Sequence, residues 1–465
     1  MKLNKKDVIY ASLVFGWISI FWNVYDQLIQ SINAYSFALD PDKSGYVLAI
    51  DNVLGLFVLP IFGHLSDKCN SKFGKRTPYI LIGTAVSLVG FVLVGVFASA
   101  RMLWPYVISL FITLFAMAAY RSAGLSIVPD FVYEPERGKA NSIANLVSVA
   151  FTVVGIALAA SFMPLKAARS ANFMPITLAV VGSSLIVVAI YIWKFKEKEV
   201  VDRFDKKLEA YKRDYPEKYH KETVVVEELS SAQMKGNVRN KIFILLSLFF
   251  FYIAYNALVS NFTVYSDVVL HFSFAQLPLI IVVVGALPGF AVAVKITEKL
   301  GRKYTIAIGL FVMFGALLLS MVFTKNTTLA MRIPLLICFF AAGVGYGFAM
   351  VNMYPFYLEL SKAKNLGQNT GVFAGVMTAA MVVTPILAGY IIRLVGESNG
   401  ATYKIMQVID GVSVEIIKTG DYNILFPYCA VAVALSTLCI LFVKSDYAKT
   451  TGRTKKGKKT EAVGE

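Results

Sequence analysis

The sequence predicts an all-α polytopic membrane protein with twelve transmembrane helices arranged as two six-helix bundles. Three observations support this fold class. Hydrophobic residues make up 57% of the 465 residues, and charged residues only 16%. Several uncharged runs exceed the roughly 18 residues that cross about 30 Å of hydrocarbon as a helix. A charged turn also recurs at the same place in each half of the chain.

The apolar windows, taken in order, give twelve predicted spans. They cover residues 8–30, 45–66, 77–98, 104–130, 140–161, 173–194, 240–262, 274–296, 303–324, 331–358, 370–394 and 423–443. No basic segment with a short apolar core and a cleavage site precedes the first span, so we expect no removed signal peptide. The four Cys and three His are dispersed, which predicts neither a disulfide framework nor a metal site.

The distribution of positive charge predicts the orientation. With the N-terminus in the cytoplasm, most Lys and Arg fall in the even-numbered loops and the two tails. The positive-inside rule therefore predicts a multi-pass protein of the plasma or cytoplasmic membrane with both termini in the cytoplasm. The net charge of +16 would suggest nucleic-acid binding in a soluble protein. Here it predicts contact with the lipid bilayer and no nucleic-acid partner.

The longest polar segments divide the chain. We expect an N-terminal bundle (1–194), a charged and partly helical cytoplasmic linker (195–239), a C-terminal bundle (240–443) and a basic tail (444–465). The outer segment 395–422 contains the alternating run "VSVEII". This segment is expected to form either a small hairpin or a lid.

The two halves repeat a charged turn. "GHLSDKCNSKFGKRTP" follows the second span and "VKITEKLGRKYT" follows the eighth, and each contains an acid, a base and then Gly-Lys-Arg or Gly-Arg-Lys. A transporter built from two related bundles shows such a repeat. Charges at the inner span ends are expected to form gates between conformations, the alternative being that they only set topology. The candidate gating residues are Asp67, Lys75, Arg76, Asp130, Glu134, Arg137, Glu298 and Arg302.

These motifs resemble a known family. The repeated turn resembles the signature of the Major Facilitator Superfamily, and its longer form at Gly63 to Pro78 resembles the glycoside/pentoside/hexuronide cation symporter branch. Further matching stretches are "VPDFVYEPERGKANSIANL" and "NLGQNTGVFAGVMTAAMVVTPILAGY". Within that branch the sequence is most similar to the proton-coupled sucrose and maltose carriers. The resemblance implies the major facilitator fold, sugar transport and no enzymatic activity.

One departure from the branch concerns the coupling ion. Melibiose-type sodium carriers keep paired aspartates on the second helix and another acid on the fourth. This chain has Gly55, Leu59 and Arg121 at those places. A sodium site is therefore not expected, and the resemblance implies a proton as the coupling ion with no cofactor.

Three charged residues lie well inside predicted spans, away from the span ends: Asp26, Asp51 and Arg121. Each costs about 2.5–3.5 kcal/mol to insert at mid-helix, so each needs a partner, a wet cavity or a changed protonation state. At 1.5 Å per residue, Asp51 and Arg121 lie about 24 and 20 Å from inner-end charges, and Asp26 about 30 Å. We expect Asp51 and Arg121 to pair, with Asp26 as the second acid.

Such a pair predicts a proton-coupling site. The Asp51 carboxylate is favoured as an anion beside Arg121, and it gains proton affinity when the arginine moves away. Two states of different proton affinity are the minimum that coupling requires. The alternative is a permanent buried ion pair that fixes two helices.

Polar residues at helical spacing predict a sugar site. Amides and hydroxyls can bind sugar hydroxyls, and aromatic rings can pack against the C–H face of a pyranose. The candidate substrate-binding residues are Trp22, Asn23, Gln27, Asn52, Asn145, Tyr252, Asn256, Tyr346 and Asn352.

The resulting hypothesis is a monomeric proton-coupled symporter that carries an α-glucoside or disaccharide, such as sucrose or maltose, by alternating access. Alternatives within the fold are another glycoside, a pentoside, a hexuronide, or export of a product. A non-transporting sugar sensor is an alternative of another class. Sensors usually carry a large soluble domain, and this chain predicts none.

Overall fold

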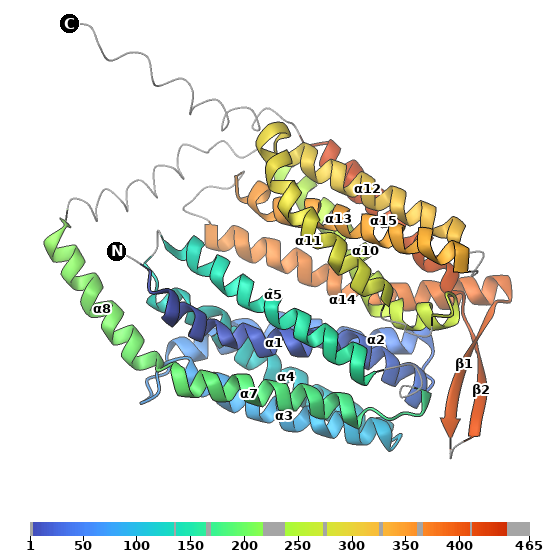
Figure 1. The fold of residues 1–465 in the computed structure, drawn as a ribbon, viewed down its shortest axis with the longest axis horizontal. Helices are drawn as coiled ribbons and strands as arrows, with labels where there is room; N and C mark the ends of the chain where they lie inside the picture. Colours follow the sequence, from blue (N-terminus) through green and yellow to red (C-terminus); the bar gives the residue numbers. More distant parts are fainter. Residues whose placement is uncertain are drawn as a thin grey trace, which may run out of the picture.

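The computed structural model describes residues 3–133, 136–163, 169–216, 238–272, 277–324, 329–359, 366–409 and 412–443. Within these residues, twelve helices are long and apolar enough to cross a membrane, which confirms the predicted number. Figure 1 shows them as two groups of antiparallel helices that lie side by side. We call α1 to α7 the N half and α10 to α15 the C half.

The N half follows the predicted spans within a few residues. Its elements are α1 (Lys5–Ser31), η1 (Ile32–Ser36), α2 (Pro41–Asp67), α3 (Thr77–Ser99), α4 (Leu103–Ile127), η2 (Pro129–Phe131), α5 (Arg137–Phe162) and α7 (Met174–Lys194). The first span is longer than predicted, because η1 extends α1 by a π-helical turn. The helix α8 (Glu197–Asp214) comes next and lies within the segment expected to be a partly helical linker.

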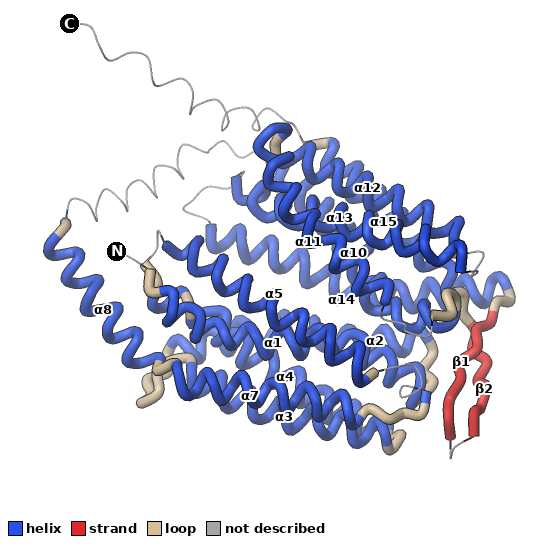
Figure 2. Tube along the Cα trace, in the orientation of Figure 1, coloured by secondary structure: helices blue, strands red, loops and turns tan. Residues whose placement is uncertain are grey.

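The C half has the same plan and one addition. Its elements are α10 (Val238–Val268), α11 (Leu277–Leu300), α12 (Arg302–Phe323), α13 (Leu329–Glu359), α14 (Leu366–Asn399), β1 (Thr402–Ile409), β2 (Val412–Thr419), η5 (Tyr422–Ile424) and α15 (Leu425–Leu441). Strands β1 and β2 pair antiparallel, so the outer segment forms the hairpin rather than the lid. Figure 2 shows this hairpin projecting beyond the helices.

The two ends of the molecule differ. We call the end where α1 begins and α15 finishes the terminal end, and the opposite end, which carries β1 and β2, the hairpin end. Helices α2 and α14 pack closely across the halves, and α1 packs on α10. At the hairpin end, Gly45 lies against the backbone at Pro385, and Gly389 against that at Pro41, with no space for a Cβ atom.

The repeated charged turn has a repeated backbone. Gly74 precedes α3 with φ +115°, and Gly301 precedes α12 with φ +84°. Both φ angles are positive, a region in which a residue with a side chain is strained, so glycine suits both turns. Pro78 then lies at the start of α3, where the fixed φ of proline favours a first helical turn.

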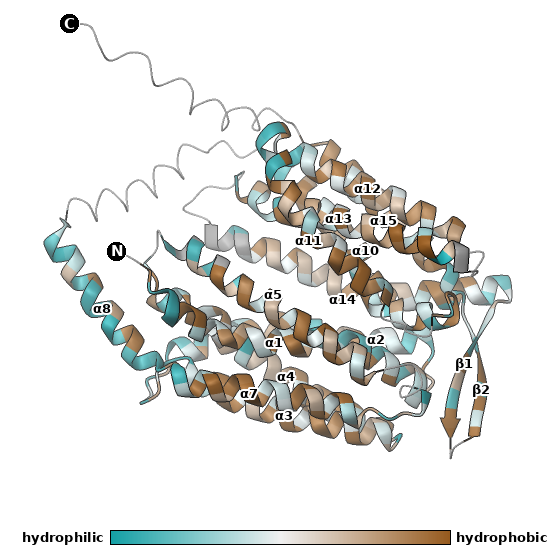
Figure 3. Ribbon diagram, viewed as in Figure 1, coloured by the Kyte–Doolittle hydropathy of each residue, from teal (hydrophilic) through white to brown (hydrophobic). Residues whose placement is uncertain are grey.

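The outer helix surfaces are apolar, as contact with lipid requires. Ile82 on α3 and Phe57 on α2 are 67% and 61% exposed. Figure 3 shows brown, apolar surfaces along α3, α7 and α12, whereas α8 is largely teal and hydrophilic. Apolar side chains on a helix surface cost free energy in water but not in hydrocarbon, so the twelve spans lie in a bilayer. The hydrophilic helix α8 lies outside it.

Candidate functional site

A cavity of about 230 Å³ lies between the two halves. The N half contributes α1 and α5 to its wall, and the C half contributes α10 and α11. The polar wall is formed by Trp22, Asn23, Asp26 and Gln27, which the 3.6-residue period places on one face of α1. Tyr255 faces them from α10. The remaining lining residues are Ile156, Ala159, Val259, Leu279, Ile280, Val282 and Val283.

Several polar atoms at this wall have no partner in the part of the chain that the structure describes. The indole N–H of Trp22 and the Oε1 atom of Gln27 are buried without a hydrogen bond to any described residue. No hydrogen bond or ion pair links the Asp26 carboxylate to a described residue either. Buried polar groups are almost always satisfied, so this cluster fits a ligand that supplies donors and acceptors.

Asn23 is held in place by its own half. Its Nδ2 atom donates to the carbonyl oxygen of Ser19 at 2.8 Å and to Oγ1 of Thr152 on α5 at 3.3 Å. Ser19 also bonds Ser148 on α5 through their hydroxyls at 2.6 Å. These hydrogen bonds join α1 to α5 and fix the orientation of the Asn23 side chain at the polar wall.

Aromatic rings flank the cavity on both sides. In the N half, the guanidinium carbon of Arg121 lies 5.6 Å from the Trp22 ring centroid. In the C half, the rings of Tyr255 and Tyr346 stack with centroids 4.9 Å apart. Rings of this kind can pack on the C–H face of a pyranose.

The predicted Asp51–Arg121 ion pair is not formed in this conformation. Asp51 accepts a 2.7 Å hydrogen bond from its neighbour Asn52, and Arg121 lies over Trp22. Asp51 is nevertheless within electrostatic range of both Arg121 and Asp26. The two acids and the arginine thus share one region, but only Asp26 lines the cavity.

Six predicted substrate residues lie outside the cavity wall, and each is engaged or placed elsewhere. Asn52 donates to Asp51, and the ring of Tyr346 stacks on that of Tyr255. Asn352 is 1% exposed and accepts a 2.9 Å hydrogen bond from Thr297, so it belongs to the terminal end of the C half. Asn256 donates to the Met381 carbonyl at 3.0 Å. Tyr252 is buried and directs its hydroxyl to Met350, and Asn145 is exposed on α5.

The predicted gating charges that the structure describes lie at the terminal end, each within its own half. The Arg76 side chain contacts Asp67 and donates to Asp130 at 2.8 Å and to Ser66 at 2.6 Å. Burial disfavours the charged form, but Asp130 and Asp67 outweigh it and raise the pKa of Arg76. In the C half, Arg302 donates to Glu359 at 2.5 Å, a partner that the sequence did not suggest.

Two other predicted gating residues that the structure describes take no part in these pairs. Glu298 has no hydrogen bond or ion pair with a described residue, and Lys75 contributes its backbone N–H rather than its side chain. Glu134 and the side chain of Arg137 lie outside the described residues.

The linker helix α8 docks on this end through Glu197, a residue that the sequence did not single out. Its carboxylate is 3% exposed and accepts backbone N–H bonds from Lys75, Arg76 and Thr77 at 2.7–3.1 Å. The first N–H groups of a helix have no partner within the helix, so Glu197, although more than 100 residues away in the sequence, caps the start of α3.

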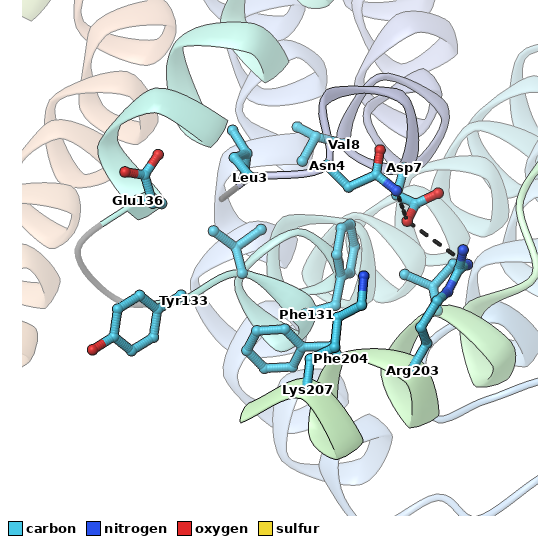
Figure 4. Close-up of a pocket in the computed structure, with 12 residues that line it drawn as sticks. Leu3, Asn4, Asp7, Val8, Phe131, Tyr133, Glu136, Arg203, Phe204 and Lys207 are labelled. Carbon is cyan, nitrogen blue, oxygen red and sulfur yellow. Dashed lines mark hydrogen bonds and ion pairs between the residues drawn. The ribbon is translucent and has the colours of Figure 1, made fainter. Parts of the chain in front are cut away.

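About two turns further along, α8 packs on η2 and on the start of α1. Figure 4 shows Phe204 facing Phe131, and Asp7 between Asn4 and Arg203. The Nη2 atom of Arg203 lies 3.7 Å from Oδ2 of Asp7, so the two form an ion pair between α8 and α1.

Charged contacts between the halves lie at the hairpin end. Asp267 on α10 binds Arg169 at 2.6 Å, and Arg393 on α14 binds Asp42 on α2 at 3.0 Å. The sequence did not predict these pairs, because Arg169 and Asp267 are about 100 residues apart and Asp42 and Arg393 about 350. The available signal was the position of each charge at the outer end of a predicted span.

Comparison with known proteins identifies the family. The family model for the Major Facilitator Superfamily matches residues 11–333 and 282–463. Sucrose transport protein SUC4 of Arabidopsis thaliana is 44% identical over 41 residues, which are 9% of this chain and 8% of that protein. Sucrose transport protein SUT4 of Oryza sativa subsp. indica is 32% identical over 95 residues, 19% of this chain and 15% of that protein. The chain therefore matches only a small part of the length of these curated relatives.

Solved structures share the fold over nearly the whole chain. The nucleoside transporter NupG is 12% identical with a TM-score of 0.62, covering 95% of this chain and 100% of that one. The xylose transporter XylE from E. coli is 13% identical with a TM-score of 0.60, covering 95% and 99%. With its family match across both halves and these twelve spans, the chain belongs to the Major Facilitator Superfamily, a family of membrane transporters and not of enzymes.

Proposed function

We propose that this protein is a proton-coupled sugar symporter that works by alternating access, with a disaccharide such as sucrose or maltose as its cargo. The observation that carries this proposal is the cavity between the halves. Its polar wall presents an indole N–H and an amide oxygen that bond no described residue, beside the carboxylate of Asp26, which is also unpaired among the described residues. The short matches to sucrose transport proteins support the same class of cargo.

The structure represents one state of the proposed cycle. Inter-half contacts such as Arg169–Asp267 and Asp42–Arg393 hold the hairpin end together. Among the described residues, the ion pairs between the halves lie at the hairpin end, and the XylE structure is described as partially occluded and inward open. The positive-inside rule places the terminal end in the cytoplasm. We therefore assign this state as closed to the outside and directed inward.

Asp26 is the residue that we propose to carry the proton beside the sugar. A protonated carboxyl can donate to a sugar oxygen, whereas an ionised one only accepts, so proton and sugar occupancy can depend on each other. Asp51 and Arg121 would then act as a second charged pair in another state of the cycle. This order reverses the sequence-based expectation, because Asp51 does not line the cavity.

The energetics suffice for accumulation. A membrane potential of about 100 mV supplies ~2.3 kcal/mol per proton, which corresponds to roughly fiftyfold accumulation at one proton per sugar.

The test is uptake of labelled sugars into vesicles that contain the purified protein, with an imposed pH gradient. We expect accumulation of a disaccharide that a protonophore abolishes. Export of a product would appear as the opposite direction of net movement. Failure of every mono- and disaccharide to enter would refute the sugar assignment, and accumulation that persists with protonophore would refute proton coupling.

A further inference from the structure

The hairpin of β1 and β2 belongs to the C half but binds the N half. It leaves α14 and returns to α15, so both of its covalent connections are in the C half. Antiparallel pairing joins Thr402 to Thr419 and continues to Ile409 and Val412. At about 3.3 Å per residue, Gln407 lies roughly 17 Å along the strand from Thr402, far enough to reach beyond α14.

The hairpin contacts the N half at three separate places. Arg101, between α3 and α4, donates to the Val408 carbonyl at 3.0 Å and to the Gln407 side chain at 3.4 Å. Gln407 is 2% exposed and its amide donates to the Ala34 carbonyl at 3.5 Å. Lys418 binds Asp40 at 3.1 Å, ahead of α2. One hairpin thus holds the α1–α2 and α3–α4 connections together.

The base of the hairpin is rigidly joined to the C half. The backbone N–H of Asp421 donates to the Ile392 carbonyl of α14 at 2.9 Å, and Gly420 packs against Gly396. The rings of Tyr403 and Tyr422 meet edge to face at 5.0 Å. Within the hairpin, Lys404 binds Glu415 at 2.7 Å. A hairpin fixed in this way moves with the C half.

We propose that this hairpin is a strap that holds the hairpin end of the transporter closed and must release the N half before that end opens. The rigid base carries the argument, because rocking of the halves then separates the strap from Arg101, Ala34 and Asp40. The strap therefore biases the conformational equilibrium toward the state seen here. The proposal rests on the alternating-access cycle proposed above, but not on the identity of its cargo.

Lys418 and Lys404 provide a matched pair of variants. Both are hairpin lysines in ion pairs, but Lys418 binds the N half and Lys404 binds Glu415 of the same hairpin. Lys418→Gln removes one positive charge and an ion pair between the halves. Lys404→Gln also removes one positive charge but leaves every contact between the halves described above in place. Arg101→Asn is a third variant, since Arg101 has φ +56° and asparagine tolerates that region.

The readout needs no substrate. Val259→Cys places a thiol at the cavity, and its labelling rate by a membrane-impermeant maleimide added on the hairpin side reports opening of that end. The same protein without Val259→Cys corrects for the native cysteines. We expect roughly threefold or greater acceleration with Lys418→Gln and with Arg101→Asn, and no change with Lys404→Gln. Unchanged labelling in both of the first two variants would overturn the proposal.

A cross-link gives the opposite perturbation. Asp40→Cys with Lys418→Cys, joined by a short, reducible bis-methanethiosulfonate, ties the strap to the N half. We expect labelling of Val259→Cys from the hairpin side to fall at least tenfold and to recover after reduction, which excludes misfolding. Lys404→Cys with Glu415→Cys, cross-linked in the same way, should label normally. Undiminished labelling with the inter-half cross-link would show that the hairpin bends with the N half, and would overturn the proposal.

Discussion

Asp267 on α10 accepts a 2.5 Å hydrogen bond from the hydroxyl of Tyr35, at the end of the first span. The two residues are 232 positions apart and belong to opposite halves. Asp267 is 6% exposed, and its other oxygen binds Arg169 at 2.6 Å. This buried carboxylate therefore has two partners in the N half, and both must leave it when the hairpin end opens.

Tyr35→Phe is expected to favour opening of the hairpin end. It removes one hydrogen bond to a charged group, worth about 1.5–3 kcal/mol, and leaves the aromatic ring in place. Hairpin-side labelling of Val259→Cys should rise by roughly tenfold or more. Asp421→Asn is the control, because the Asp421 side chain caps only its own turn at Asn423. Equal labelling of the Tyr35 variant and the parent would show that this bond does not restrain opening.

Asp26→Asn is expected to abolish uphill accumulation and to retain exchange of labelled for unlabelled sugar. The amide keeps the shape of the cavity wall but cannot take up and release a proton. Asp51→Asn, away from the cavity wall, should retain part of the accumulation. Proton-driven uptake and exchange in the same vesicles measure both quantities. If Asp26→Asn concentrates sugar as well as the parent protein does, the proton site lies elsewhere.

The spans and the repeated turn could be predicted because their signals are local. Apolar length fixes a membrane helix, and Gly74 and Gly301 occupy turns whose backbone requires them. The period of α1 also predicted most of the polar cavity wall, since residues three and four apart share one face. The depth estimate placed Asp51 and Arg121 at similar heights, but distance along a helix axis does not tell which way a side chain faces, and in this conformation Asp51 bonds Asn52 while Arg121 lies over Trp22.

Pairings between distant segments could not be predicted from the sequence. Asp42 and Arg393 are ordinary charges at span ends until the fold brings α2 against α14. Asn352 lies within a polar stretch of α13, but its side chain is engaged by Thr297. Periodicity identifies a polar face, whereas the partner of that face depends on helix packing.

Glu197→Gln is expected to loosen α8 and to lower the melting temperature. The variant replaces a buried carboxylate that accepts three backbone N–H bonds by an amide with a single acceptor oxygen. The loss should be about 1–3 kcal/mol. Thermal unfolding of the detergent-solubilised protein measures it, with exposed Glu199→Gln on the same helix as control. Equal melting temperatures for the two variants would contradict the capping role.

Gly389→Leu is expected to force α2 and α14 apart at the hairpin end. A Cβ atom at Gly389 would overlap the Pro41 carbonyl, and overpacking of this kind costs about 1–3 kcal/mol. Hairpin-side labelling of Val259→Cys should increase. Gly371→Leu, on the same helix, is the control, because a Cβ atom there meets nothing within 4 Å. An increase with both variants would indicate general damage to α14 rather than loss of a close contact.

The strap contact at Asp40 is expected to be insensitive to pH from about 5 to 8. Partial burial opposes ionisation of Asp40, but Lys43 and Lys418 outweigh it and lower the pKa of this carboxyl. Because the pKa is lowered, the ionised Asp40 carboxylate stabilises the closed hairpin end fully at any pH above its unperturbed pKa of about 3.9. This stabilisation is lost only as the pH falls through the lowered pKa. The ratio of hairpin-side labelling rates in Lys418→Gln and the parent protein cancels the pH dependence of the thiol itself. That ratio should stay constant between pH 5 and 8 and approach one in stronger acid. A ratio that changes near pH 6 or 7 would show that another group controls the contact.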